Sequence, residues 1–97
     1  DEGIRKTIAS NENTHPSFLE KLAKDTSIDV RSHVAENHRT NTNTLQKLAE
    51  DKSKKVRLAV AENSNTSKCA LLKLATDKCY EIRSKVAAHT KTPTDVL

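Results

Sequence analysis

Aromatic residues, methionine, glycine and proline are rare or missing in this chain of 97 residues. It has one phenylalanine, one tyrosine, one glycine, two prolines and neither tryptophan nor methionine, and hydrophobic residues make up only 34% of it. With so few aromatic and other hydrophobic residues, the chain would fill a compact globular core poorly. One glycine and two prolines disfavour a β-sandwich with many tight turns. A single glycine also excludes the glycine-rich loops that hold nucleotide phosphates. Lysine, glutamate, leucine and alanine are common instead, and they favour helices.

Long apolar runs and paired cysteines are also missing. No stretch of 18 apolar residues occurs, and no basic start is followed by an apolar stretch, so we expect neither a membrane span nor a secretory signal. The only cysteines are Cys69 and Cys79. Separated by one predicted helix, they would lie about 15 Å apart, beyond the roughly 7 Å that a disulfide allows between Cα atoms. Two free thiols fit a reducing cytoplasm, and two cysteines cannot hold an iron–sulfur cluster alone.

A unit of 26 residues repeats along the chain. Residues 31–56 and 57–82 align without gaps and share 12 identical positions. Three rows of residues recur at this interval: Arg5, Arg31, Arg57 and Arg83; Leu19, Leu45, Leu71 and Leu97; Ala9, Ala35, Ala61 and Ala87. A fixed period of this size predicts a solenoid, in which each unit buries its apolar face against its neighbours.

We therefore expect one all-α domain over residues 1–97, a right-handed α-solenoid of three full units and a partial fourth. The units span about 4–29, 30–55, 56–81 and 82–97. The chain begins in mid-repeat without methionine, and neither end carries a polar capping repeat, so we expect a fragment of a longer array.

Two apolar patterns in each unit predict two short helices. Leu19, Leu22 and Ala23 form one stripe of a helix over about 15–24. The threonine row precedes this helix in each unit, and we expect these residues to be its N-caps: Thr14, Thr40, Thr66 and Thr92, the last followed by Pro93.

The second stripe predicts a helix of about two turns, with Val30, Val34 and Ala35 on its buried side. Ser27 and Ser53 are its expected N-caps. An asparagine stands where each copy should end, and we expect it to adopt the left-handed conformation that stops a helix: Asn11, Asn37 and Asn63, with His89 in the last copy.

The unit resembles the leucine-rich repeat variant family. The string V-R-x-x-V-A-x-N appears as residues 30–37, and it continues to Leu45, Leu48, Ala49 and Asp51, with Thr92-Pro93 similar to the family's T-P step. The resemblance covers essentially the whole chain and implies a right-handed superhelix that pairs an α-helix with a 3₁₀-helix. The unit is slightly longer than usual for the family, so a regular α-helix is an alternative for the second helix of the unit, near Val30, or for its entry. The Asp…Val-Arg piece is also similar to HEAT repeats, and neither resemblance implies an activity.

The arginine row suggests the hypothesis of nucleic-acid binding, but an aspartate precedes three of its members by six residues. Arg5, Arg31, Arg57 and Arg83 can bridge carboxylates or free carbonyls of neighbouring units through their forked donors. The aspartates are Asp25, Asp51 and Asp77. A residue required once per unit usually holds layers together, so we expect a structural ladder, with a ligand-facing row as the alternative.

Two sets of lysines are candidate contacts for an anion or a partner. Lys21, Lys47 and Lys73 each have an aspartate four residues later, which predicts weak helical ion pairs or, alternatively, a charge ladder that follows a polyanion. Lys52, Lys54 and Lys55 form the densest basic cluster, at the start of a predicted helix where an anion could bind. Asp29 and Glu81 interrupt this patch in the flanking units, so solvated lysines are favoured.

Apolar departures from the repeat are candidate partner contacts. Leu58 and Leu72 stand where other units have polar or small residues, as does Phe18. Single exposed leucines are also ordinary on protein surfaces.

The remaining chemistry-bearing residues show no catalytic or ligand pattern. The four histidines lack metal-ligand spacing, and no serine, histidine and aspartate group as a triad. We expect no cofactor and no enzymatic activity. The favoured function is a non-catalytic scaffold that presents an extended surface to a protein partner. The alternatives are binding of a nucleic-acid duplex backbone, for which a net charge of +4 is permissive, and a structural spacer within a larger protein.

Overall fold

The computed structural model describes residues 1–89, which form seven α-helices and no strand. Helices of nine residues alternate with helices of seven. In chain order they are α1 (Glu2–Ser10), α2 (Pro16–Leu22), α3 (Ile28–Glu36), α4 (Thr42–Leu48), α5 (Lys54–Glu62), α6 (Lys68–Leu74) and α7 (Tyr80–Ala88). The predicted all-α class is confirmed. Both helices of each unit are regular α-helices, including the longer one that begins near Val30, for which the resemblance implied a 3₁₀-helix and a regular α-helix was the alternative.

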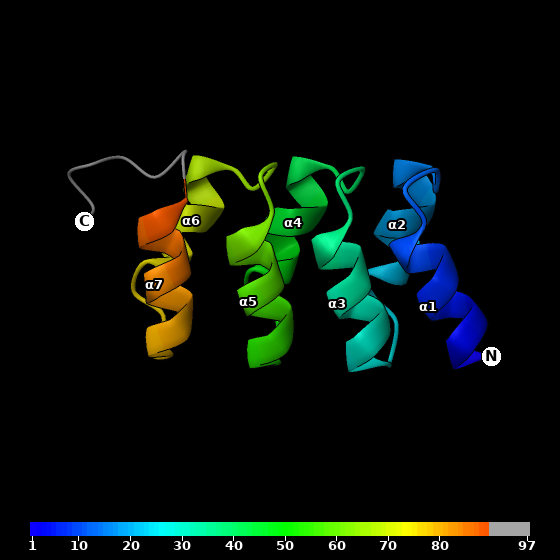
Figure 1. The fold of residues 1–97 in the computed structure, drawn as a ribbon, viewed down its shortest axis with the longest axis horizontal. Helices are drawn as coiled ribbons and strands as arrows, with labels where there is room; N and C mark the ends of the chain where they lie inside the picture. The colour runs from blue at the N-terminus through cyan, green and yellow to red at the C-terminus, as the bar shows by residue number, and fades with distance from the viewer. Residues whose placement is uncertain (90–97) are drawn as a thin grey trace.

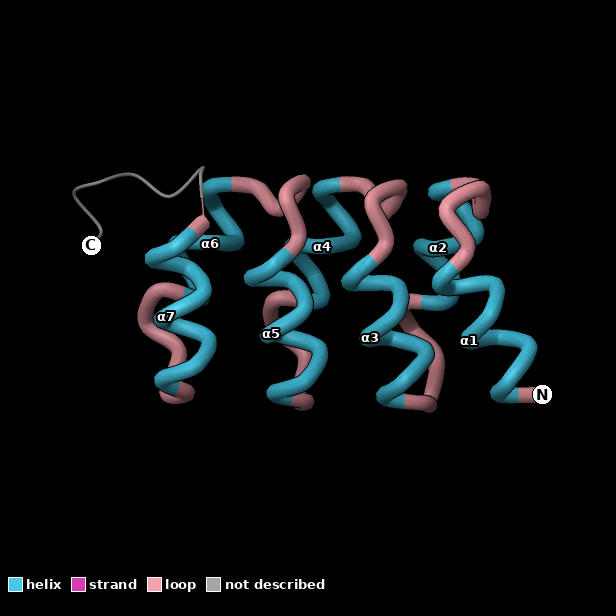
Figure 2. The backbone as a smooth tube through the Cα atoms, in the orientation of Figure 1, coloured by secondary structure: helices cyan, strands magenta, loops and turns pink. Residues whose placement is uncertain are grey.

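The four longer helices stand side by side along the long axis of the molecule, and the shorter helices lie behind them (Figure 1). Helix α3 packs between α1 and α5, and α5 packs against α7. Each shorter helix contacts the longer helices before and after it in the chain, and α4 also contacts α6. Loops join the two rows at both ends of the helices (Figure 2), and the whole extends over 43 × 22 × 16 Å.

The core runs between the two rows and repeats from layer to layer. The leucine row supplies side chains from the shorter helices that are at most 1% exposed: Leu19, Leu45 and Leu71. The valine row supplies fully buried side chains from the longer helices: Val30, Val56 and Ile82. Both predicted apolar stripes are therefore buried. Ile4, in the same row as Val30, is 61% exposed because no helix packs on the outer side of α1.

The predicted N-caps of the shorter helices are wrong by one residue. The caps are His15, Asn41 and Ser67, and each accepts a hydrogen bond from the first turn through its side chain. The threonine before each cap has another role, since its hydroxyl donates to the carbonyl six residues earlier, near the end of the preceding longer helix. These bonds are all 2.6 Å long: Thr14 to Ile8, Thr40 to Val34, and Thr66 to Val60.

The first shorter helix is also briefer than expected, at Pro16–Leu22 rather than about 15–24, because Ala23 already caps its C-terminus. Thr92 and Pro93 lie outside the described residues. Ser27 and Ser53 are the N-caps of α3 and α5, as predicted, although only Ser27 accepts a side-chain cap bond.

The asparagines that end the longer helices do not adopt the left-handed conformation. Asn11, Asn37 and Asn63 are extended, with φ of −75°, −76° and −77°. No residue in the described part of the chain has a positive φ. The prediction was wrong because the backbone stays extended at these positions, where the side chains of Asn37 and Asn63 instead bond carbonyls of the preceding layer.

Candidate binding surface

Three arginines of the longer helices form ion pairs with the aspartates in the turns before the next longer helices. The Nε of Arg5 lies 2.7 Å from Oδ2 of Asp25, and the same contact recurs at 2.8 Å in the next two layers, for Arg31 with Asp51 and Arg57 with Asp77. A second nitrogen of Arg31, Nη2, lies 3.3 Å from Oδ1 of Asp51. Each of these three arginines thus holds the aspartate that follows it by 20 residues, in the turn before the next longer helix.

The remaining guanidinium nitrogen binds the turn before its own helix. Nη1 of Arg31 donates to the carbonyl of Asp25 at 2.8 Å, and Nη1 of Arg57 donates to the carbonyl of Asp51 at 2.9 Å. Arg83 makes the corresponding bond to the carbonyl of Asp77 at 2.6 Å, and its guanidinium lies 5.9 Å from the centre of the Tyr80 ring. One arginine therefore joins consecutive turns, with geometry that only a forked side chain provides.

Hydrogen bonds hold two of these aspartates, Asp25 and Asp77, in the charged form. The Ser27 N–H donates to Asp25, and with Arg5 it lowers the pKa of that carboxyl below its usual range despite partial burial. Burial acts to raise the pKa of Asp77, but the Cys79 N–H and Arg57 outweigh it, so this pKa is also lowered. Both carboxylates are therefore committed to structure rather than available for proton transfer.

The asparagine row, which we expected only to end the longer helices, forms a second connection between neighbouring units. Nδ2 of Asn37 donates to the carbonyls of Ala9 and Asn11 at 2.8 and 3.0 Å. Asn63 repeats this arrangement one layer on, at 2.7 and 3.1 Å. In the last copy Nε2 of His89 takes the place of the amide, 2.8 Å from the carbonyl of Asn63. The replacement of asparagine by histidine, which can also donate a hydrogen bond from a side-chain nitrogen, was the signal in the sequence.

The predicted pairs between lysine and the aspartate four residues later do not form, because arginine already holds each aspartate. Nζ of Lys73 lies instead 3.3 Å from Glu50, in the layer before. Lys21 and Lys47 make no ion pair within the described residues, and both side chains are exposed.

The dense lysine cluster is largely neutralised. Nζ of Lys54 lies 2.9 Å from Glu81, and Nζ of Lys55 lies 2.6 Å from Asp29. These hydrogen bonds lower the pKa of both carboxyls and raise the pKa of both lysines. The flanking acidic residues that interrupt the patch in sequence thus become the partners of its lysines, while Lys52 stays exposed.

The three apolar departures from the repeat do not gather into one patch. Leu58 is partly buried and packs against the core, so it is less exposed than the other two. Leu72 and Phe18 are each 47% exposed, but they lie on α6 and α2, with α4 between them in the row. No apolar docking site is formed by these residues.

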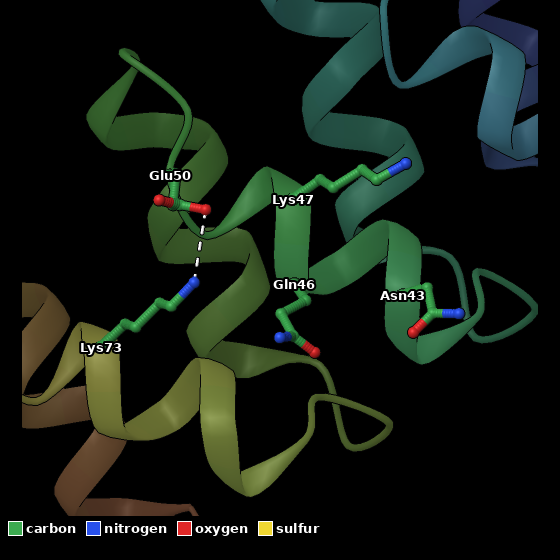
Figure 3. Close-up of a pocket in the computed structure, with 5 residues that line it drawn as sticks. All are labelled: Asn43, Gln46, Lys47, Glu50 and Lys73. Atoms are coloured by element: carbon green, nitrogen blue, oxygen red, sulfur yellow. Dashed lines mark hydrogen bonds and ion pairs between the residues drawn. The ribbon is translucent and has the colours of Figure 1, made fainter.

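A polar hollow lies between α4 and α6 (Figure 3). Its volume is about 290 Å³, and its lining is Asn43, Gln46, Lys47, Glu50 and Lys73. The Lys73–Glu50 pair closes one side, and the Asn43 and Gln46 amides project from α4 beside Lys47 (Figure 3). Amides both donate and accept hydrogen bonds, so the hollow can satisfy a ligand that carries both kinds of group.

Charge is distributed unequally between the two rows of helices. The longer helices carry as many acidic as basic side chains in addition to the arginine–aspartate pairs: Lys6, Lys54, Lys55, Arg83 and Lys85 against Glu2, Asp29, Glu36, Glu62 and Glu81. The shorter helices and the turns after them expose a set that we call the lysine face: Lys21, Lys24, Lys47, Lys52, Lys68, Lys73 and Lys78. Only Glu20 and Glu50 oppose this set, so the net positive charge of the chain resides there.

Residues 1–89 contain no group of three or more metal-ligating side chains that could hold a metal ion. Cys69 and Cys79 are both free thiols. None of the helices described is long and apolar enough to cross a membrane.

No protein-family model matches the chain, and neither the curated proteins nor the solved structures include a significant match.

Proposed function

We propose that the chain is part of an α-solenoid of the leucine-rich repeat variant type and acts as a non-catalytic scaffold for a protein partner. The observation that carries this proposal is the concentration of net charge on the lysine face, beside longer helices whose charges cancel. A spacer has no need of such an asymmetry. A surface that repeats over an elongated body suits an extended partner.

The rigid connections between layers support the same function. Arginine–aspartate pairs and asparagine amides bond each layer to the next at the same points. Such repetition fixes the spacing of the exposed side chains, and a preorganised surface loses less conformational entropy when it binds.

Binding of a nucleic-acid duplex is the second candidate, favoured by the excess of exposed lysines on one side of the molecule. It is the weaker of the two because Glu20 and Glu50 stand among these lysines, where they would repel phosphates.

Affinity capture from a nuclease-treated extract of the source cells tests the scaffold function. We expect the immobilised chain to retain a protein in stoichiometric amount. The matched control is Leu45→Asp, which places a charge at a fully buried position and should unfold the helices. Retention by the folded chain alone supports the scaffold, whereas retention by neither chain, or by both equally, would favour the spacer.

A further inference from the structure

We propose that the lysine face binds an extended, acidic segment of a protein partner, with an acidic residue at about every third position. This inference rests on the proposed scaffold function and adds the surface and the chemistry of the partner. Its first support is charge complementarity, because the shorter helices and the turns after them expose seven lysines and only two glutamates. Lys21 and Lys47 have no acidic partner among the described residues and are therefore available to carboxylates of another chain.

The polar hollow between α4 and α6 indicates a polypeptide rather than a nucleic acid. A peptide backbone offers both N–H donors and carbonyl acceptors. The side chains that line the hollow include both hydrogen-bond acceptors for the N–H groups and donors for the carbonyls. Asn43 and Gln46 can donate and accept, while the carboxylate of Glu50 can only accept. A phosphate backbone presents acceptor oxygens and negative charge, so Glu50 would oppose it. The same carboxylate suits a backbone N–H.

The spacing of the layers sets the spacing of the acidic residues. Neighbouring packed helices lie about 8–10 Å apart, and three residues of polyproline II helix advance about 9 Å. A segment in that conformation therefore presents one side chain per layer along the same line. Lys21, Lys47 and Lys73 occupy the same position in three successive units and would each meet one acidic side chain.

Fluorescence anisotropy with labelled probes tests the inference. The principal probe is the peptide (Glu-Pro-Ala)4, and its controls are a peptide of equal composition with the four glutamates in one block and a 20-base-pair DNA duplex. We expect (Glu-Pro-Ala)4 to bind the chain at about 50 mM salt more tightly than either control. The substitutions Lys21→Gln, Lys47→Gln and Lys73→Gln together should weaken this binding about tenfold.

The matched variant carries Lys54→Gln, Lys55→Gln and Lys85→Gln, which remove the same charge from the longer helices. We expect it to bind the peptide almost as well as the unmodified chain, and circular dichroism should show that both variants stay folded. Equal weakening by the two variants, equal binding of the blocked peptide, or tighter binding of the duplex would each overturn the inference. Absence of peptide binding together with specific protein capture would overturn the acidic partner and leave the scaffold intact.

Discussion

Arg31 holds Asp51 through two guanidinium nitrogens, at 2.8 Å from Nε and 3.3 Å from Nη2, across a separation of 20 residues. The two side chains are only 17% and 11% exposed. Neither charged group would be well solvated without the other. The pair therefore ties α3 to the turn before α5.

The substitution Arg31→Ala should lower the free energy of unfolding by about 2 kcal/mol, because it leaves the Asp51 carboxylate half-buried without its partner. Arg31→Lys should cost about half as much, since an ammonium group cannot reproduce the fork. Thermal unfolding followed by circular dichroism measures both changes. Arg39→Ala is the control, because Arg39 is exposed, and an equal loss there would contradict the role of the pair.

Asn63 should be as sensitive, since its amide bonds two carbonyls of the preceding layer and its side chain is almost wholly buried. We expect Asn63→Ala to lower the free energy of unfolding by about 2–3 kcal/mol. Asn63→Asp should cost at least as much, because it points a carboxylate at the carbonyls of Ala35 and Asn37. Urea denaturation measures these losses against Asn13→Ala, at an exposed position. A well-tolerated aspartate would show that the amide donor is not needed.

The hydroxyl of Thr40 should matter more than its methyl group, since it donates at 2.6 Å to the carbonyl of Val34 and is buried. Thr40→Val keeps the shape and removes the donor, and we expect a loss of about 1–2 kcal/mol. Thr40→Ser keeps the donor and should lose less. If serine proved the worse replacement in thermal unfolding, packing rather than hydrogen bonding would explain the threonine row.

Ser32 offers the opposite test, a substitution that should stabilise the fold. Its hydroxyl is buried and has no hydrogen-bond partner among the described residues. We expect Ser32→Ala to raise the free energy of unfolding by about 1 kcal/mol, because it removes an unsatisfied polar group and introduces the best helix former. Ser84→Ala, at the exposed equivalent position in α7, separates the two effects by reporting helix propensity alone. An equal gain at both sites would assign no cost to the buried hydroxyl.

Acid should destabilise the protein through Asp25 and Asp77. Their pKa values are lowered in the folded state, so they bind fewer protons there than in the unfolded chain. Their contribution is complete above the unfolded value of about 3.9 and is lost as pH falls through the lower folded values. Melting temperatures should hold steady from pH 7 to about 5 and fall below about 4. High salt should screen the exposed Lys55–Asp29 pair more than these partly buried ones. A variant with Asp25→Asn and Asp77→Asn should show a shallower acid dependence.

The helical spacing of the apolar residues was enough to predict the buried stripes of the inner helices, because an apolar side chain that recurs at this spacing, such as Leu45, is buried between the two rows of helices. The repeat also brought Arg31 and Asp51 under consideration together. It could not say which neighbours meet. Lys47 was expected to pair with Asp51 on one helix, but Arg31 of the preceding longer helix takes that carboxylate, and a linear spacing does not show which helices meet.

Residues with two possible roles caused the other errors. Thr40 and Asn41 are both good N-caps, and the first residue of a helix is assigned only to within a residue or two. Asn63 can stop a helix through its backbone or through its side chain, and only the position of the preceding layer decides between them. Leu58 stands where other units have polar residues such as Ser32, and it is partly buried because this position packs against the core.

The reach of the interlayer bonds has a consequence for how the chain folds. The asparagine amides span 28 residues at most and the arginine–aspartate pairs span 20, so every connection joins a layer to its immediate neighbour. Chains with such local contacts have a small loop-closure cost and fold fast, in microseconds to milliseconds. In an α-solenoid, which we propose this chain to be, one formed pair of layers can serve as the template for the next. Folding can therefore begin at any layer and spread in both directions, before distant parts of the chain have met.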